Sequence, residues 1–185
     1  MTHGIRTLPI AAFATCVLWT ACSQPPDPAQ LAAVDQLITV TDAALLTLNE
    51  LDRNRYLRSD SLLAQQQAGF EARFDDTLDR ATALALGSQY IVLRAAEQMG
   101  TDHERVIAEI ANASERLRNL RIDLAAGAIE PKSAGALIAA EQQQHSALID
   151  AVHHVIDNYK LVQQAWDRRD SVAMRFADLN TPGTP

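Results

Sequence analysis

The sequence is poor in cysteine, aromatic residues and basic residues, and each shortage excludes a class of protein. Two cysteines in 185 residues leave no disulfide framework. Aromatic residues make up 5%, which disfavours an aromatic-rich β-barrel or a large aromatic ligand pocket. Sixteen Lys and Arg against 23 Asp and Glu give a net charge of −7, so we expect no nucleic-acid partner. A chain of this length buries roughly 70% of its unfolded surface and folds without a staple.

Proline is almost absent from the interior of the chain. None of the seven prolines lies between Ala29 and Glu130, or between Lys132 and Thr181. Proline breaks helices, so long proline-free runs with apolar residues three and four apart predict long helices. No strand-like alternation is found, and the fold class is therefore predicted to be all-α.

Residues 1–21 have the pattern of an export signal. Arg6 is followed by an uncharged run from Thr7 to Ala21. Its 15 residues are too short to cross a bilayer, which needs about 20. The run ends Leu18-Trp19-Thr20-Ala21-Cys22. This segment resembles the lipobox of bacterial lipoprotein precursors.

The resemblance implies that Cys22 becomes the lipid-bearing first residue of the mature chain. In that family the cysteine sulfur is joined to diacylglycerol and the new amino terminus is acylated, which anchors the protein in a bilayer. Ser23 resembles the residue after the cysteine in lipoproteins forwarded to the outer membrane, facing the periplasm. The alternative is an ordinary secretory signal cut before an unmodified cysteine. The cysteine count favours lipidation, because Cys22 is then the only thiol left and cannot form an intramolecular disulfide.

The rest of the chain is predicted to be one helical domain. Residues 22–27 form a lipidated tether, residues 28–179 the helical domain, and residues 180–185 a disordered tail. Asp27 is a suitable cap for a helix whose first residue is Pro28. We expect an antiparallel up-down-up-down four-helix bundle, a long coiled-coil-like rod, with short connections. Its helices are expected at about 28–52, 60–100, 102–126 and 133–179.

The boundary between the second and third helices rests on three residues. Gly100 is predicted to be a left-handed cap, and Thr101 and Glu104 have the spacing of a capping box. His103 then lies in a solvent-facing turn, and the polar segment 53–60 is another turn. The stripe expected for the second helix is Leu63, Phe70, Phe74, Leu78, Ala81, Leu84, Ile91 and Ala95. The stripe expected for the third is Val106, Ile110, Ala113, Leu117, Leu120 and Leu124.

Motifs of catalysis and cofactor binding were not found in the sequence. Nucleotide-binding glycine loops, the glycine-flanked serine of hydrolases and the zinc motif with two histidines four apart are all missing. Only Asp150 and His153 have the spacing of a metal-binding pair, whereas a di-metal bundle needs two Glu-x-x-His segments. We therefore expect no enzyme activity, no cofactor and no metal site.

Two places in the last helix are candidate sites. Glu141 and His145 fall on its apolar stripe, with His145 expected opposite Ser114. They form either a polar layer that sets the register of packing or a pH-responsive or ligand-binding point. The second place is a candidate partner seam beyond the reach of the shorter third helix. Its residues are Tyr159, Val162, Trp166, Ala173 and Phe176.

The seam has two explanations. Either the first two helices of the same chain cover it, or it docks a second protomer or another envelope protein. The function predicted from these features is that of a membrane-anchored, non-enzymatic scaffold, adaptor or interaction module. A sensor of a small ligand, a metal or pH, using Glu141 and His145, is the alternative.

Overall fold

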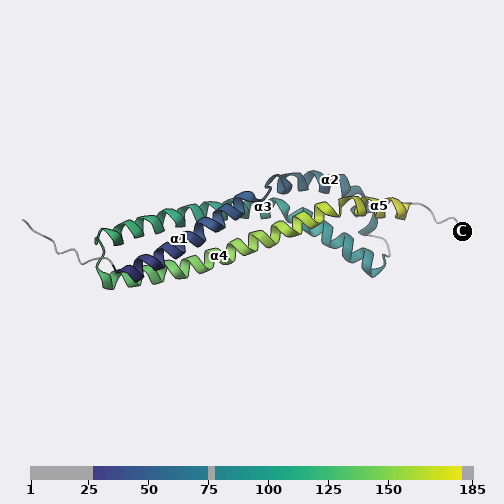
Figure 1. The fold of residues 1–185 in the computed structure, drawn as a ribbon. Coiled ribbons are helices and arrows are strands. Elements are labelled where there is room, and N and C mark those ends of the chain that lie inside the picture. Colours follow the sequence, from purple (N-terminus) through teal and green to yellow (C-terminus); the bar gives the residue numbers. More distant parts are fainter. Residues whose placement is uncertain (1–26, 75–77, 181–185) are drawn as a thin grey trace, which may run out of the picture.

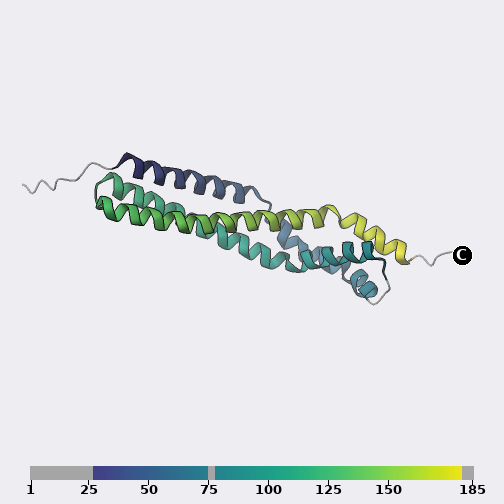
Figure 2. The same cartoon turned by 90° about the horizontal axis from the view of Figure 1, so that it is seen from below.

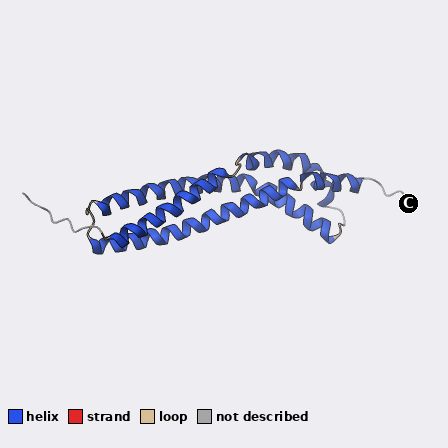
Figure 3. Cartoon of the chain, viewed as in Figure 1, coloured by secondary structure: helices blue, strands red, loops and turns tan. Residues whose placement is uncertain are grey.

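The computed structural model describes residues 27–74 and 78–180, and every regular element in those ranges is a helix (Figures 1 and 3). This confirms the all-α prediction, and α1 to α4 pack against one another. The predicted signal, Cys22, most of the tether and residues 181–185 lie outside the described residues. The helices are α1 (Pro28–Glu50), α2 (Asn54–Phe74), α3 (Arg80–Ala125), α4 (Pro131–Asp167) and α5 (Arg169–Asn180).

α1 runs antiparallel to α3. Near the start of α1, Asp35 pairs with Arg121, which lies near the end of α3. Near the end of α1, the carbonyl oxygen of Leu48 lies 3.0 Å from a ring nitrogen of His103, in the middle of α3. α2 continues in the direction of α1 along the first half of α3, as Figures 1 and 2 show.

α4 runs parallel to α1 and α2. Gln30 in the first turn of α1 donates to the carbonyl of Pro131 at the start of α4. Farther along, the ring nitrogen of Trp166 donates to the carbonyl of Arg55 in α2. The chain therefore forms three legs, made of α1 with α2, α3 alone, and α4 with α5. The order of these legs is up, down, up, so it differs from the four alternating legs that were expected, because α2 does not turn back on α1.

The predicted boundary at Gly100 is wrong, because α3 passes through it without a break. A Cβ atom at Gly100 would lie 3.0 Å from the Cβ atom of Tyr56, so the glycine allows α2 to approach rather than ending a helix. Thr101 donates its hydroxyl to the carbonyl of Glu97 at 3.1 Å, a bond made inside a helix. Within residues 27–74 and 78–180, the left-handed backbone is found at Gly127, with φ 66°, just after the end of α3.

The start of the first helix is as predicted, but other expected boundaries moved. Asp27 caps α1 as predicted, because its carboxylate accepts from the amide of Ala29 at 2.9 Å. The segment 53–60, expected as a turn, lies mostly in α2, and the true turn covers residues 51–53. The segment expected to be one helix over 60–100 belongs to two helices. α2 ends at Phe74, and α3 begins at Arg80 with Asp79 as its cap. The Asp79 carboxylate accepts from the amides of Ala81 and Thr82, both at 3.0 Å.

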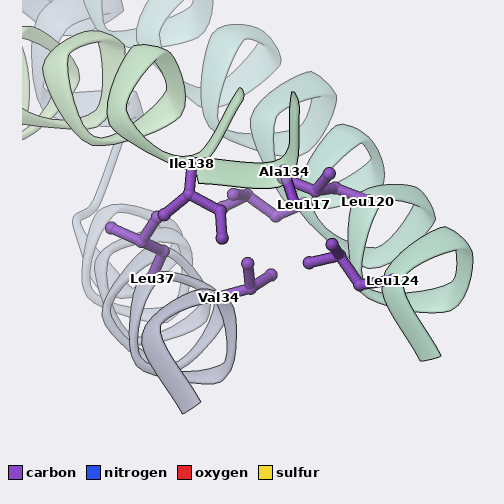
Figure 4. Packing of buried hydrophobic residues seen from close by; sticks show 7 residues of the cluster. All are labelled: Val34, Leu37, Leu117, Leu120, Leu124, Ala134 and Ile138. Atoms are coloured by element: carbon purple, nitrogen blue, oxygen red, sulfur yellow. The ribbon is translucent and has the colours of Figure 1, made fainter. Parts of the chain in front are cut away.

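The core is a series of apolar clusters that follow one another along the rod. In the cluster nearest the start of α1, side chains of α1, α3 and α4 meet between the three helices (Figure 4). Each large aliphatic side chain buried in this way contributes about 1.5–3 kcal/mol. The residues in Figure 4 are Val34, Leu37, Leu117, Leu120, Leu124, Ala134 and Ile138.

The predicted stripe of the 102–126 segment is buried at every position. The stripe predicted for 60–100 is out of register in its second half. There Leu84 and Ile91 are 64% and 66% exposed, whereas Leu86 and Leu93 are buried. Gln89 lies on the true stripe and donates its side-chain amide to the carbonyl of Ala165 at 3.0 Å, which explains why a polar residue is buried there.

By length and composition alone, the segment Pro28–Ala72 contains a window apolar enough to cross a membrane, with a hydropathy of 1.5. Core helices of soluble proteins pass the same test. α1 carries Asp35 and Asp42, whose carboxylates bind Arg121 and Arg118 of α3. These ion pairs favour packing of α1 on α3.

Candidate functional site

The turn of residues 51–53, called the joint below, and the ends of α1 and α2 beside it are bound by side chains of α3 and α4. His103 of α3 is fully buried, and its Nε2 lies 3.0 Å from the carbonyl oxygen of Leu48. A neutral ring with the proton on Nε2 donates to this oxygen, which belongs to the last turn of α1. The prediction of a solvent-facing His103 is wrong, because α3 is continuous and places it on the buried stripe between Ala96 and Val106.

Two tyrosines pack around His103. The ring of Tyr56 meets the rings of His103 and Tyr159 edge-on, with centroids 5.7 and 5.9 Å apart. Burial raises the pKa of Tyr56 to about 12, with a further contribution from Tyr159. The Tyr159 hydroxyl accepts from the backbone amide of Asp52 at 3.3 Å, so α4 also binds the joint.

Trp166 makes the third contact with this region. Its Nε1–H donates to the carbonyl of Arg55 and to the hydroxyl of Ser59, at 3.2 Å each. Both acceptors lie in the first turns of α2. α1 and α2 make few contacts with each other. Side chains of α3 and α4 therefore hold the two helices in line across the joint.

A pocket of 320 Å³ opens beside the joint, and we call it the arginine pocket. Its lining includes three arginines and one tryptophan. Arg169 donates to the carbonyl of Trp166 at 2.9 Å, and its guanidinium carbon lies 6.0 Å from the Trp166 ring centroid. The lining residues are Asp52, Arg55, Arg58, Trp166 and Arg169.

Glu141 and His145 lie on the inner side of α4, but no hydrogen bond joins them among the described residues. Glu141 is bound instead by the guanidinium of Arg116, at 3.3 and 3.4 Å. His145 is half-buried, its Nε2 has no partner, and burial lowers its pKa. Ser114, the expected neighbour, donates to Asp42 of α1.

The predicted seam is covered by α2 and α3 over much of its length. Val162 is fully buried against Tyr56 of α2 and Ala96 of α3. The ring of Phe176 stands 5.2 Å from that of Phe70. A Cβ atom at Gly69 would lie 2.8 Å from the Phe176 ring, so this glycine makes room for it. Ala173 faces solvent.

Sequence reasoning missed the joint and the arginine pocket. The signal for the pocket is present in two short basic segments, Arg53-Asn54-Arg55 with Arg58, and Arg168-Arg169. Across residues 27–74 and 78–180, no group of three or more His, Cys, Asp and Glu side chains could hold a metal ion. Comparison with protein-family models, curated proteins and solved structures finds no significant match.

Proposed function

We propose that this protein is a lipid-anchored, non-enzymatic helical module of the bacterial cell envelope, which holds an extended rod at a membrane surface for a protein partner or a second copy. The observation that carries the proposal is the lipobox-like segment ending Thr20-Ala21-Cys22. Acylation at more than one position gives stable anchoring where a single chain is marginal. Ser23 favours the outer membrane as the destination.

The rod supports this role by its dimensions. The stretch from Cys22 to Asp27 spans at most about 20 Å when extended, which holds the start of α1 close to the bilayer. α3 has 46 residues, and a helix of that length extends about 69 Å. A three-leg rod tethered at one end offers a long surface to a partner, and we propose that this elongated form persists in solution.

The anchor is tested with Cys22→Ser in cells fed a labelled fatty acid. The unchanged protein is expected to carry label and to sediment with membranes. The variant should lose the label and leave the membrane fraction. If an uncleaved signal holds the variant in the membrane instead, residues 1–21 remain on the purified chain. Cys16→Ser is the matched control, because Cys16 is removed with the signal. A variant that keeps both label and membrane association would refute the proposal.

A second candidate function is a pH or ligand sensor at His145. The observation that favours it is the buried, unpartnered Nε2 of His145 together with its lowered pKa. The ion pair of Glu141 with Arg116 leaves the histidine without a carboxylate partner. Chemical shifts of the His145 ring, followed between about pH 5 and pH 8, test the idea. A ring that titrates without any change in neighbouring residues contradicts a sensing role.

A further inference from the structure

The arginine pocket unites two basic segments that are far apart in the chain. Arg55 and Trp166, which a hydrogen bond joins, are 111 residues apart. Around this contact, Arg58 of α2 and Arg169 of α5 face the same pocket. Three arginines therefore line one pocket in a chain whose net charge is −7.

The positive charge of these groups is only weakly balanced. Arg58 makes no hydrogen bond or ion pair with any described residue. The Nε of Arg55 is buried without a hydrogen-bond partner, and its nearest carboxylate oxygen, on Asp52, is 3.9 Å away. Arg169 lies 3.6 Å from a carboxylate oxygen of Asp170. Both distances exceed those of a charge-assisted hydrogen bond, about 2.7–2.9 Å.

The position of the cations adds to this imbalance. Arg55 lies in the first turn of α2, and this turn contains no acidic residue. The start of a helix carries partial positive charge, so cations there are unfavourable and an anion is favourable. The one carboxylate in the lining, on Asp52, already accepts from the backbone amide of Asn54 at 3.1 Å. A bound anion would relieve the repulsion among the arginines.

We propose that the arginine pocket binds a phosphate group. The planar fork of a guanidinium fits two phosphate oxygens at once, and a phosphate has enough oxygens and charge for three such forks. Trp166 forms the wall that orients Arg169 by a cation–π contact. The volume of 320 Å³ leaves room for a diphosphate or a phosphodiester.

The phosphate has two possible sources, a phospholipid headgroup or a soluble phosphate compound. α1 places the joint about 37 Å along the rod from Asp27. A headgroup therefore reaches the pocket only when the rod lies along the bilayer, whereas a soluble compound reaches a standing rod as well. The proposal does not depend on the anchor, since it concerns residues 52–58 and 166–169 alone.

Trp166 provides the readout. The sequence has two tryptophans, and Trp19 leaves with the predicted signal, so Trp166 is the only one in the mature chain. The mature protein in an uncharged detergent is titrated with inorganic diphosphate against chloride at equal ionic strength. We expect a saturable change in Trp166 emission and a higher melting temperature with diphosphate.

The variants Arg58→Gln and Arg169→Gln separate a site from general ionic effects. Each is expected to weaken diphosphate binding about tenfold or more, because a charged hydrogen bond is lost. Arg80→Gln is the matched control, because Arg80 is exposed and lies outside the pocket, and it should bind as the unchanged protein does.

A second arm reconstitutes the protein into phosphatidylcholine vesicles with and without phosphatidylglycerol. An emission change that needs phosphatidylglycerol and Arg58 identifies a headgroup as the source. A response to diphosphate but not to this lipid identifies a soluble phosphate. If neither probe changes the emission, or if Arg58→Gln responds as strongly as Arg80→Gln, the proposal is overturned.

Discussion

At the residue scale, His103 is a titratable group that is fully buried. Burial lowers its pKa, and nearby Arg53 lowers it further, while the bond to Leu48 and the charge of Glu104 act in the opposite direction. The neutral ring donates to the last turn of α1, whereas a protonated ring would place a charge beside Tyr56 and leave Nδ1–H without an acceptor. The joint therefore depends on neutral His103.

The free energy of unfolding is expected to fall as the pH drops below about 6.5. Because the folded pKa of His103 lies below the unfolded value, the unfolded chain binds more protons, and stability is lost as the pH falls through that unfolded value. His103→Gln keeps a side-chain N–H donor but removes the titration, so it should flatten the curve. Urea unfolding between about pH 5 and pH 7.5 measures this.

His145 serves as a comparison in that experiment. Burial also lowers the pKa of His145, but its ring is less buried than that of His103, so His145→Gln should remove a smaller share of the slope. A curve for His103→Gln that matches the unchanged protein would contradict the role assigned to His103.

At the element scale, two glycines of α3 test how closely the helices approach. Gly87→Ala should stabilise the protein by about 0.5–1 kcal/mol, because alanine favours helix and no atom lies within 4 Å of the added Cβ. Gly100→Ala should destabilise it by about 1–2 kcal/mol, because the added Cβ meets the Cβ atom of Tyr56 at 3.0 Å. Thermal melting of the two variants should give shifts of opposite sign.

A substitution of Trp166 tests whether helices of the same chain cover the seam. Trp166→Ala removes a half-buried ring and two hydrogen bonds to α2, and should cost about 3 kcal/mol. Ala173→Ser, on the exposed side of α5, is the matched control and should change little. Urea unfolding of the monomer measures both. Near-normal stability of Trp166→Ala with loss of self-association would show instead that the seam is a protein interface.

Helix content and the apolar stripe of the 102–126 segment were predictable from spacing. The register of the second half of the 60–100 stripe and the ends of most helices were not. The stripe from Val106 to Leu124 needed only its regular period. Gly100 has the same sequence signature whether it ends a helix or admits a neighbouring one, and only its tertiary contact with Tyr56 decides. Asp79 is a local capping signal, and a prediction based on the spacing of apolar residues alone does not use it.

The candidate sites were harder to predict, because they depend on which legs meet. Glu141 and His145 are half-buried on α4, and the partner of Glu141 is Arg116, a long side chain reaching across from α3. The arginine pocket forms only because α2 runs parallel to α4 and brings Arg58 beside Arg169. The four alternating helices that were expected gave no reason to place Arg58 beside Arg169.

At the scale of the whole molecule, the three-leg rod would join the proposed lipid anchor at Cys22 to a side-chain-bound joint farther along. Residues 27–74 and 78–180 form the rod, and the segment before them carries the predicted lipid. The proposed scaffold role and the proposed orientation of the rod on a membrane both start from Cys22. The chemical state of that residue is therefore the most informative property to measure.

The most direct test is mass spectrometry of the amino-terminal peptide of protein purified from membranes. We predict that the mature chain begins at Cys22, that its sulfur carries a diacylglycerol thioether, and that its amino group carries a fatty acyl chain. Treatment with iodoacetamide should then leave the protein unmodified, because no free thiol remains. A chain that begins elsewhere, or one whose Cys22 is alkylated by iodoacetamide, would contradict the lipid-anchored account.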